Sequence, residues 1–149
     1  SMTELSGQGF ELVIPPTPEF PQLARAIVGV AAGLGGGASS SLDPGRIADL
    51  RLVVSEAVTN AIEAQGEIGV SDRILVCCRV ADDHVVVEVV DHGPGFDPDS
   101  VPDLPDVETP ERLRHESGLG VALMRRLSDE AVVESGPGGT TVRLTIRPS

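Results

Sequence analysis

The feature that most constrains the fold is a long stretch with helical periodicity in the first half of the sequence. Asp43-Pro44 is typical of a helix start, because an Asp caps free amides and a Pro fits the first turn. The apolar residues that follow recur at spacings of three and four, so they share one face that must be buried. They are Ile47, Leu50, Val54, Ala57, Val58, Ala61 and Ile62. The helix therefore predicts a layered domain in which this face packs against a second layer.

Short apolar runs supply the second layer. Bounded by turn residues, they predict strands at 10–14, 73–80, 84–90, 131–134 and 140–146. Further helices are predicted at about 17–34 and 118–127, with a flexible glycine- and serine-rich loop at 35–41. Hairpin-linked strands with helices between them indicate an α+β fold. We expect a two-layer sandwich of a mostly antiparallel mixed sheet with helices on one face.

Length and cysteine usage bound the domain organisation and the compartment. The 149 residues suffice for one domain with a core, which we place at 9–149. Residues 1–8 are expected to be a tag remnant and a flexible N-terminus, because Ser1 precedes Met2. No apolar run approaches the roughly 20 residues of a membrane span. Adjacent Cys77 and Cys78 favour neither a disulfide nor a zinc site, and they fit reduced thiols in the cytoplasm.

The charge of the chain argues against direct nucleic-acid binding. A formal net charge of −12 repels a phosphate backbone, and the absence of Trp and Tyr removes the side chains that best stack on bases. The same acidity suits a partner with a basic surface. It equally serves only to keep a protein soluble.

Polar residues at particular positions on these predicted helices and strands indicate a functional site. Glu56 and Asn60 stand four residues apart on the long helix, so their side chains rise from the same face one turn apart. An acid beside a neutral oxygen suits two tasks, activating a nucleophile and holding Mg²⁺. Asp91 follows Val85, Val87 and Val89 on the same face of one predicted strand. It should therefore lie at the end of that strand, half-buried and facing the layer that covers the sheet.

Glycine motifs follow in a fixed order along the chain. They are Asp91-His92-Gly93-Pro94-Gly95-Phe96, then Ser117-Gly118-Leu119-Gly120, then Gly138-Gly139-Thr140-Thr141. Taken singly, each has an ordinary interpretation: a strand-end cap or turn for the first, a hinge before a helix for the second, and a common strand residue for Thr140. Taken alone, Asn60 would be a polar residue at the solvent-exposed edge of a helix. Residues 96–117, with four prolines and no clear period, are typical of a functional or disordered loop.

Together these features resemble the GHKL ATP-binding superfamily of gyrase, Hsp90, histidine kinases and MutL. They match its N box, its two glycine boxes and its closing Gly-Thr, from about Pro44 onward. The resemblance implies a Bergerat-type ATP-binding fold in which Asp91 accepts a hydrogen bond from the adenine amino group. Gly93 and Gly95 would permit close backbone approach, Asn60 would be a ligand of Mg²⁺, and 96–117 would be the ATP lid.

The same resemblance assigns the remaining nucleotide contacts. Ser117, Gly118, Leu119 and Gly120 would hold the phosphates, because free amides at a helix N-terminus favour anions and glycines let them approach. Thr140 would hydrogen-bond near the phosphates or the adenine.

Two stretches narrow the resemblance further. Residues 54–62 and 118–130 look like the bacterial anti-sigma factor serine/threonine kinases. Such proteins bind a sigma factor, phosphorylate an anti-anti-sigma partner with Mg-ATP, and are commonly homodimers. Glu56 would then act as general base toward the partner's hydroxyl, or toward water.

The sequence departs from that group at two positions. Ala64 stands where many relatives carry His, and Glu116 stands where some carry an Arg that reaches the γ-phosphate; Arg112 and Arg114 lie nearby. An acid beside a polyphosphate is unfavourable, so a second hypothesis stays open. It is a nucleotide-binding anti-sigma or scaffold module with little or no kinase activity. A third is the kinase part of a larger phosphatase-linked regulator.

Overall fold

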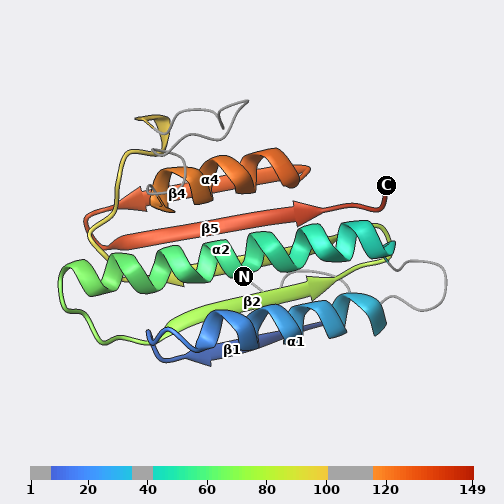
Figure 1. Ribbon diagram of the computed structural model, residues 1–149, viewed down its shortest axis with the longest axis horizontal. Helices are drawn as coiled ribbons and strands as arrows, with labels where there is room; N and C mark the ends of the chain where they lie inside the picture. The colour runs from blue at the N-terminus through green and yellow to red at the C-terminus, as the bar shows by residue number, and fades with distance from the viewer. Residues whose placement is uncertain (1–7, 35–41, 101–115) are drawn as a thin grey trace.

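A five-stranded sheet forms one layer of the molecule (Figure 1). The computed structural model describes residues 8–34, 42–100 and 116–149. The strands are β1 (Gln8–Ile14), β2 (Ile74–Val80), β3 (Val85–Asp91), β4 (Glu130–Gly136) and β5 (Gly139–Ile146). Their order is β1-β2-β3-β5-β4, and each neighbouring pair runs antiparallel. The expected, mostly antiparallel arrangement is confirmed, with no parallel pair among the described strands.

Helices form the second layer, all on one face of the sheet (Figure 1). They are α1 (Phe20–Leu34), α2 (Pro44–Glu67) and α4 (Glu116–Leu127), with a short 3-10 turn η2 (Pro98–Ser100). The predicted α+β sandwich is therefore confirmed. The predicted loop at 35–41, most of the predicted lid at 96–117 and the tail at 1–7 lie outside the described residues.

Strand β3 shows how the sequence pattern positions the site. Its residues alternate between buried and half-buried, and Val85, Val87, Val89 and Asp91 all point toward the helices. The prediction that Asp91 continues a row of buried valines is confirmed. The buried face of α2, including Leu50, Val54 and Val58, packs on this side of the sheet. Each fully buried aliphatic side chain contributes about 1.5–3 kcal/mol to folding.

One arginine ties the end of the helical layer to the end of the sheet. Arg46, in the first turn of α2, donates to the carbonyl oxygen of Leu127 at 3.1 Å, where α4 ends. Its Nε donates to the Arg147 carbonyl oxygen at 2.9 Å, just after β5. The same guanidinium pairs with Asp49 at 2.9 Å and Asp129 at 2.7 Å. The start of α2 is thereby held to the ends of α4 and β5, which lie far from it in the sequence.

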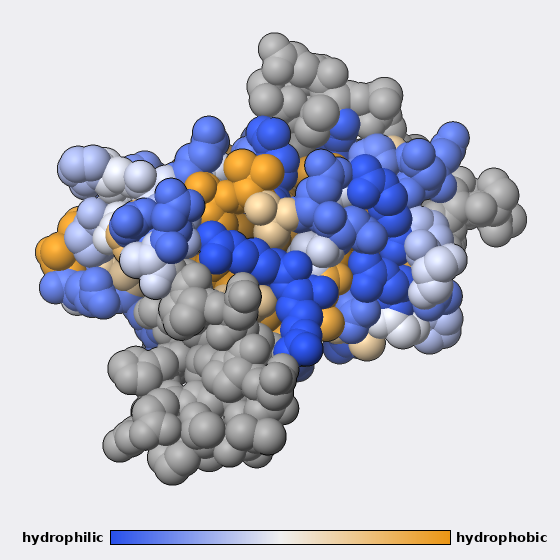
Figure 2. All heavy atoms as spheres, turned by 90° about the horizontal axis from the view of Figure 1, so that it is seen from above, coloured by the Kyte–Doolittle hydropathy of each residue, from blue (hydrophilic) through white to orange (hydrophobic). Residues whose placement is uncertain are grey.

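The surface on the side of α4 and β4 is mostly hydrophilic, with an apolar patch near its middle (Figure 2). Among the described residues, no helix combines the length and the apolar character needed to span a membrane. Cys77 and Cys78 are free and buried, as the sequence predicted.

Candidate functional site

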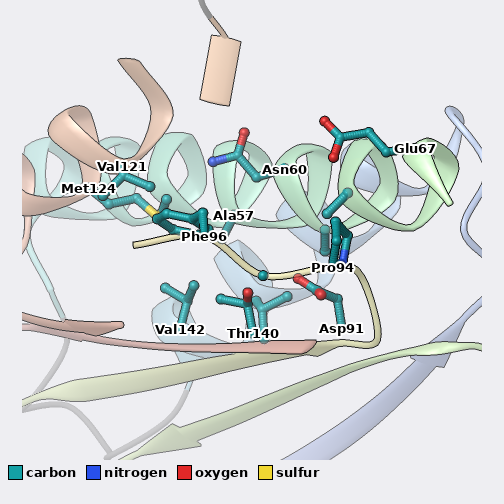
Figure 3. A pocket seen from close by; sticks show the side chains of 14 residues that line it. Ala57, Asn60, Glu67, Asp91, Pro94, Phe96, Val121, Met124, Thr140 and Val142 are labelled. Atoms are coloured by element: carbon teal, nitrogen blue, oxygen red, sulfur yellow. The ribbon is translucent and has the colours of Figure 1, made fainter. Parts of the chain in front are cut away.

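A cavity of about 200 Å³ lies between α2, α4 and the sheet (Figure 3). That volume far exceeds the about 30 Å³ that one water molecule takes up in the liquid. Its walls are largely apolar, with a few polar groups, the composition of a small-molecule pocket. The apolar walls include Ala57, Ala61, Val89, Val121, Met124 and Val142, and the polar groups are Asn60, Glu67, Asp91 and Thr140.

Asp91 brings a carboxylate into this cavity from the end of β3 (Figure 3). Its side chain is buried, and Oδ1 accepts a hydrogen bond from the Gly93 amide at 2.8 Å. Burial raises the pKa of Asp91 above its usual range, against the opposing effect of the Gly93 hydrogen bond. A carboxylate so placed gains from a ligand that donates a hydrogen bond.

Thr140 lies beside Asp91 on the neighbouring strand. The two residues are paired in the register of β3 and β5, and both line the cavity. The Thr140 hydroxyl is 2.7 Å from the Ser135 hydroxyl, which also accepts a hydrogen bond from the Phe96 amide at 2.8 Å. Ser135 therefore joins the β4–β5 hairpin to the chain that leaves the cavity at Phe96.

Asn60 lines the opposite wall, on α2, and its amide points away from the sheet that carries Asp91 (Figure 3). Its Oδ1 is buried and finds no hydrogen-bond partner in the described part of the chain. A β-carbon placed on Gly120 would come within 2.6 Å of Asn60 Nδ2, so the Asn60 amide would have to shift if this position carried a side chain. An unpaired buried oxygen is costly unless a ligand meets it.

Glu56 lies one helical turn before Asn60 and does not line the cavity. It is half-buried at the border of the buried face of α2. Burial raises the pKa of Glu56, and the nearby charge of Glu63 raises it further. The predicted pair thus shares one helix face, with Asn60 at the cavity and Glu56 beside it.

The glycine motifs divide between the two walls. Gly95 lines the cavity at a φ of 81°, and a β-carbon there would collide with the Gly136 carbonyl oxygen, so the position requires glycine. Gly93 is buried next to Ala64 of α2. Ser117, Gly118 and Leu119 lie in the first turn of α4, which begins two residues before the predicted start at Gly118.

Some cavity residues escaped the sequence analysis. Val121 and Met124 reach the cavity from α4 because they stand three residues apart on one face of the helix. That spacing was a usable signal. Ser135 gave none, because nothing in a short strand marks a serine that will bond to a loop in another part of the chain.

Comparison with known proteins agrees with this geometry. The model of the histidine kinase-like ATPase domain matches residues 14–146. An anti-sigma F factor from Caldanaerobacter subterraneus subsp. tengcongensis is 36% identical over 112 residues, covering 72% of this chain and 76% of that protein. A serine-protein kinase RsbW from Bacillus velezensis is 34% identical over 139 residues, covering 91% of this chain and 82% of that protein.

A solved structure with a similar fold also contains an RsbW domain. It contains the RsbU and RsbW domains of Rv1364c from Mycobacterium tuberculosis, with a TM-score of 0.63 and 27% identity. The match covers 95% of this chain and 33% of that longer chain. The family model and the relatives, both of which span most of the chain, show that the chain belongs to the histidine kinase-like ATPase domain family, in the group of the anti-sigma F factors and RsbW serine-protein kinases.

Proposed function

We propose that the chain is a Mg-ATP-dependent protein serine/threonine kinase and anti-sigma factor. It would sequester a sigma factor in the cytoplasm and phosphorylate an anti-anti-sigma protein. The observation that carries the proposal is the cavity itself, which the Asp91 carboxylate lines from the sheet and Asn60, with its unpaired oxygen, lines from α2 between apolar walls. The names of the anti-sigma F factor and RsbW relatives support the partner classes.

The donor set of the cavity fits adenine and magnesium. Asp91, whose pKa is raised by burial, would accept a hydrogen bond from the adenine amino group between apolar walls. Asn60 Oδ1 would be one oxygen ligand of Mg²⁺, which prefers oxygen and keeps other ligands from water and phosphate. The first turn of α4 would meet the phosphates with its free amides. Gly93, Gly95 and Thr140 would shape the wall around the base.

Bound Mg-ATP would supply the phosphoryl group, and Glu56 would accept the proton of the partner's serine or threonine hydroxyl. A carboxylate with a raised pKa is a stronger base than an exposed one, which suits that task. Glu56 lies beside the cavity rather than in its wall, where a protein substrate rather than the nucleotide would meet it. We further propose that 9–149 is one kinase domain that forms a homodimer, with 96–117 as its ATP lid.

The position of Glu56 also favours a second candidate function. Because Glu56 does not line the cavity, the nucleotide can be held without a base in contact with it. The chain would then be a nucleotide-binding anti-sigma or scaffold module with little or no kinase activity.

Phosphoryl transfer to a partner separates the two candidates. The wild type is incubated with γ-labelled ATP, Mg²⁺ and a purified anti-anti-sigma protein from the same organism. We expect label on the partner, and we expect Glu56→Gln to slow the transfer by about 10²–10⁴-fold while nucleotide affinity is retained.

The exposed Glu19 provides the matched control, because Glu19→Gln makes the same chemical change at a residue that does not line the cavity. It should transfer label at the wild-type rate. If wild-type protein binds nucleotide and leaves the partner unlabelled, the kinase proposal fails and the binding module is supported. If neither ATP nor ADP binds, both candidates fail.

A further inference from the structure

Gln65 is a polar side chain buried in the core next to the cavity. It stands one helical turn beyond Ala61 on the buried face of α2, and its exposed fraction is 0%. A buried amide that lacked hydrogen bonds would destabilise the fold, so its partners decide what it does. They come from two segments, the loop between α2 and β2 and the chain after β3.

Three of the four hydrogen-bonding positions of the Gln65 side chain are used, both donors and one acceptor. Nε2 donates to the carbonyl oxygens of Val70 at 3.3 Å and Asp72 at 2.6 Å. Oε1 accepts from the His92 amide at 2.9 Å. Two carbonyls on one side and an amide on the other fix which end of the side chain is nitrogen and which is oxygen.

The hydrogen bond between Gln65 and the His92 amide lies next to Asp91, the carboxylate that enters the cavity. His92 directly follows Asp91, whose Oδ1 accepts from Gly93 on the other side of His92. Gln65 thus holds the middle of the three-residue turn that sets the direction of the Asp91 carboxylate. At its far end the same stretch is held by the bond from the Phe96 amide to Ser135.

We propose that Gln65 is a positioning residue for recognition of the nucleotide base, acting through the His92 amide on Asp91. The inference rests on the proposed function in one respect, that Asp91 meets the amino group of adenine. Without the Gln65 oxygen, the amide of His92 loses its buried acceptor and the turn is free to move. The Asp91 carboxylate then meets the amino group less well, while apolar contacts and phosphate contacts stay in place.

The test compares two nucleotides that differ only in the amino group. Dissociation constants are measured for ATP and for purine riboside triphosphate, which is ATP without that group, each with Mg²⁺. In Gln65→Met, a side chain of similar length without polar bonding, we expect the preference for ATP to fall by roughly tenfold, as for loss of one buried polar contact. A purely structural role would weaken both nucleotides equally and leave their ratio unchanged, which would overturn the proposal.

Two further variants keep the test decisive. Gln65→Glu keeps the shape of the side chain and an oxygen that accepts from the His92 amide, and we expect it to keep most of the ATP preference. If Gln65→Met does not fold, Gln65→Glu alone provides the test. Loss of the ATP preference in Gln65→Glu would overturn the proposal. Gln22→Met, on the exposed face of α1, should leave the ratio at the wild-type value. If wild-type protein binds both nucleotides equally, the assignment of Asp91 in the proposed function fails instead.

Discussion

Burial raises the pKa of Asp91, so the folded protein holds this proton more tightly than the unfolded chain does. For an acid whose folded pKa is raised, the contribution to stability is full below the unfolded pKa and is lost as pH rises through the folded pKa. At neutral pH the buried charge therefore costs folding free energy. An aspartate at position 91 therefore does not serve the stability of the empty protein.

Asp91→Asn should separate stability from nucleotide binding. Asparagine keeps an oxygen for the Gly93 amide and removes the buried charge. We expect the free energy of unfolding of the empty protein at pH 7 to rise by about 0.5–2 kcal/mol, the usual gain from a stabilising substitution. The gain should shrink as pH falls through the raised pKa of folded Asp91 toward the ordinary pKa of Asp, where both states become protonated, while ATP binding is lost throughout. Urea unfolding from pH 7 to pH 4 checks this, and a less stable variant at pH 7 contradicts it.

Individual site residues were predictable where a local motif marked them. Asn60, Asp91 and Thr140 come from separate elements, and the structure brings all three to one cavity. Gln65 carried a weaker signal: it continues the buried stripe of α2 by one turn, yet a lone polar residue near a helix end suggests a solvated edge. Only the fold shows which carbonyls and which amide surround it.

Elements were predictable because each hydrophobic pattern is local. The start of α2 at Pro44 was anticipated from Asp43-Pro44, but the predicted side-chain cap is absent, because the Asp43 carboxylate accepts hydrogen bonds from Ser149 instead. Each of the five strands was anticipated to within a few residues. The start of α1 differs, because the Phe20 amide bonds to the Thr17 carbonyl oxygen in a turn that precedes the helix. The strand order β1-β2-β3-β5-β4 could not be inferred residue by residue, since it depends on which distant edges pair.

Arg46 should be a main support of the element packing. It makes contacts to α2, to the end of α4 and to the end of β5, and its side chain is only 17% exposed. Arg46→Met would leave two carbonyls and two carboxylates without this donor. We expect a loss of about 1.5–3 kcal/mol in the free energy of unfolding, measured by urea denaturation.

The chain offers a matched control for that substitution. Arg143 pairs with Glu88 at 2.9 Å on the face of the sheet away from the helices, and its side chain is 54% exposed. Arg143→Met should cost less than about 1 kcal/mol, as exposed ion pairs do. Equal losses in the two variants would show that the position of Arg46 between elements adds nothing.

At the scale of the whole molecule, the cavity joins both layers of the domain. Its walls come from α2, α4, β3, β5 and the chain after β3, so one ligand contacts elements from both halves of the sequence. Unfolding any of these walls would destroy the site. A nucleotide should therefore stabilise the domain as a unit rather than a single element of it.

Thermal unfolding with and without metal tests this cooperative picture. At 100 times its Kd, a ligand of the folded state adds about 2.7 kcal/mol, which corresponds to an increase of about 5–10 °C in Tm for a domain of this size. Mg-ATP should raise the Tm of the wild type in one transition, and ATP with EDTA at the same concentration should raise it less. In Asn60→Ala the difference between these two conditions should disappear, because the unpaired Oδ1 is the protein's expected oxygen for the metal. If the magnesium-dependent increase persists in Asn60→Ala, Asn60 is not the ligand, and the proposed metal position on α2 is wrong.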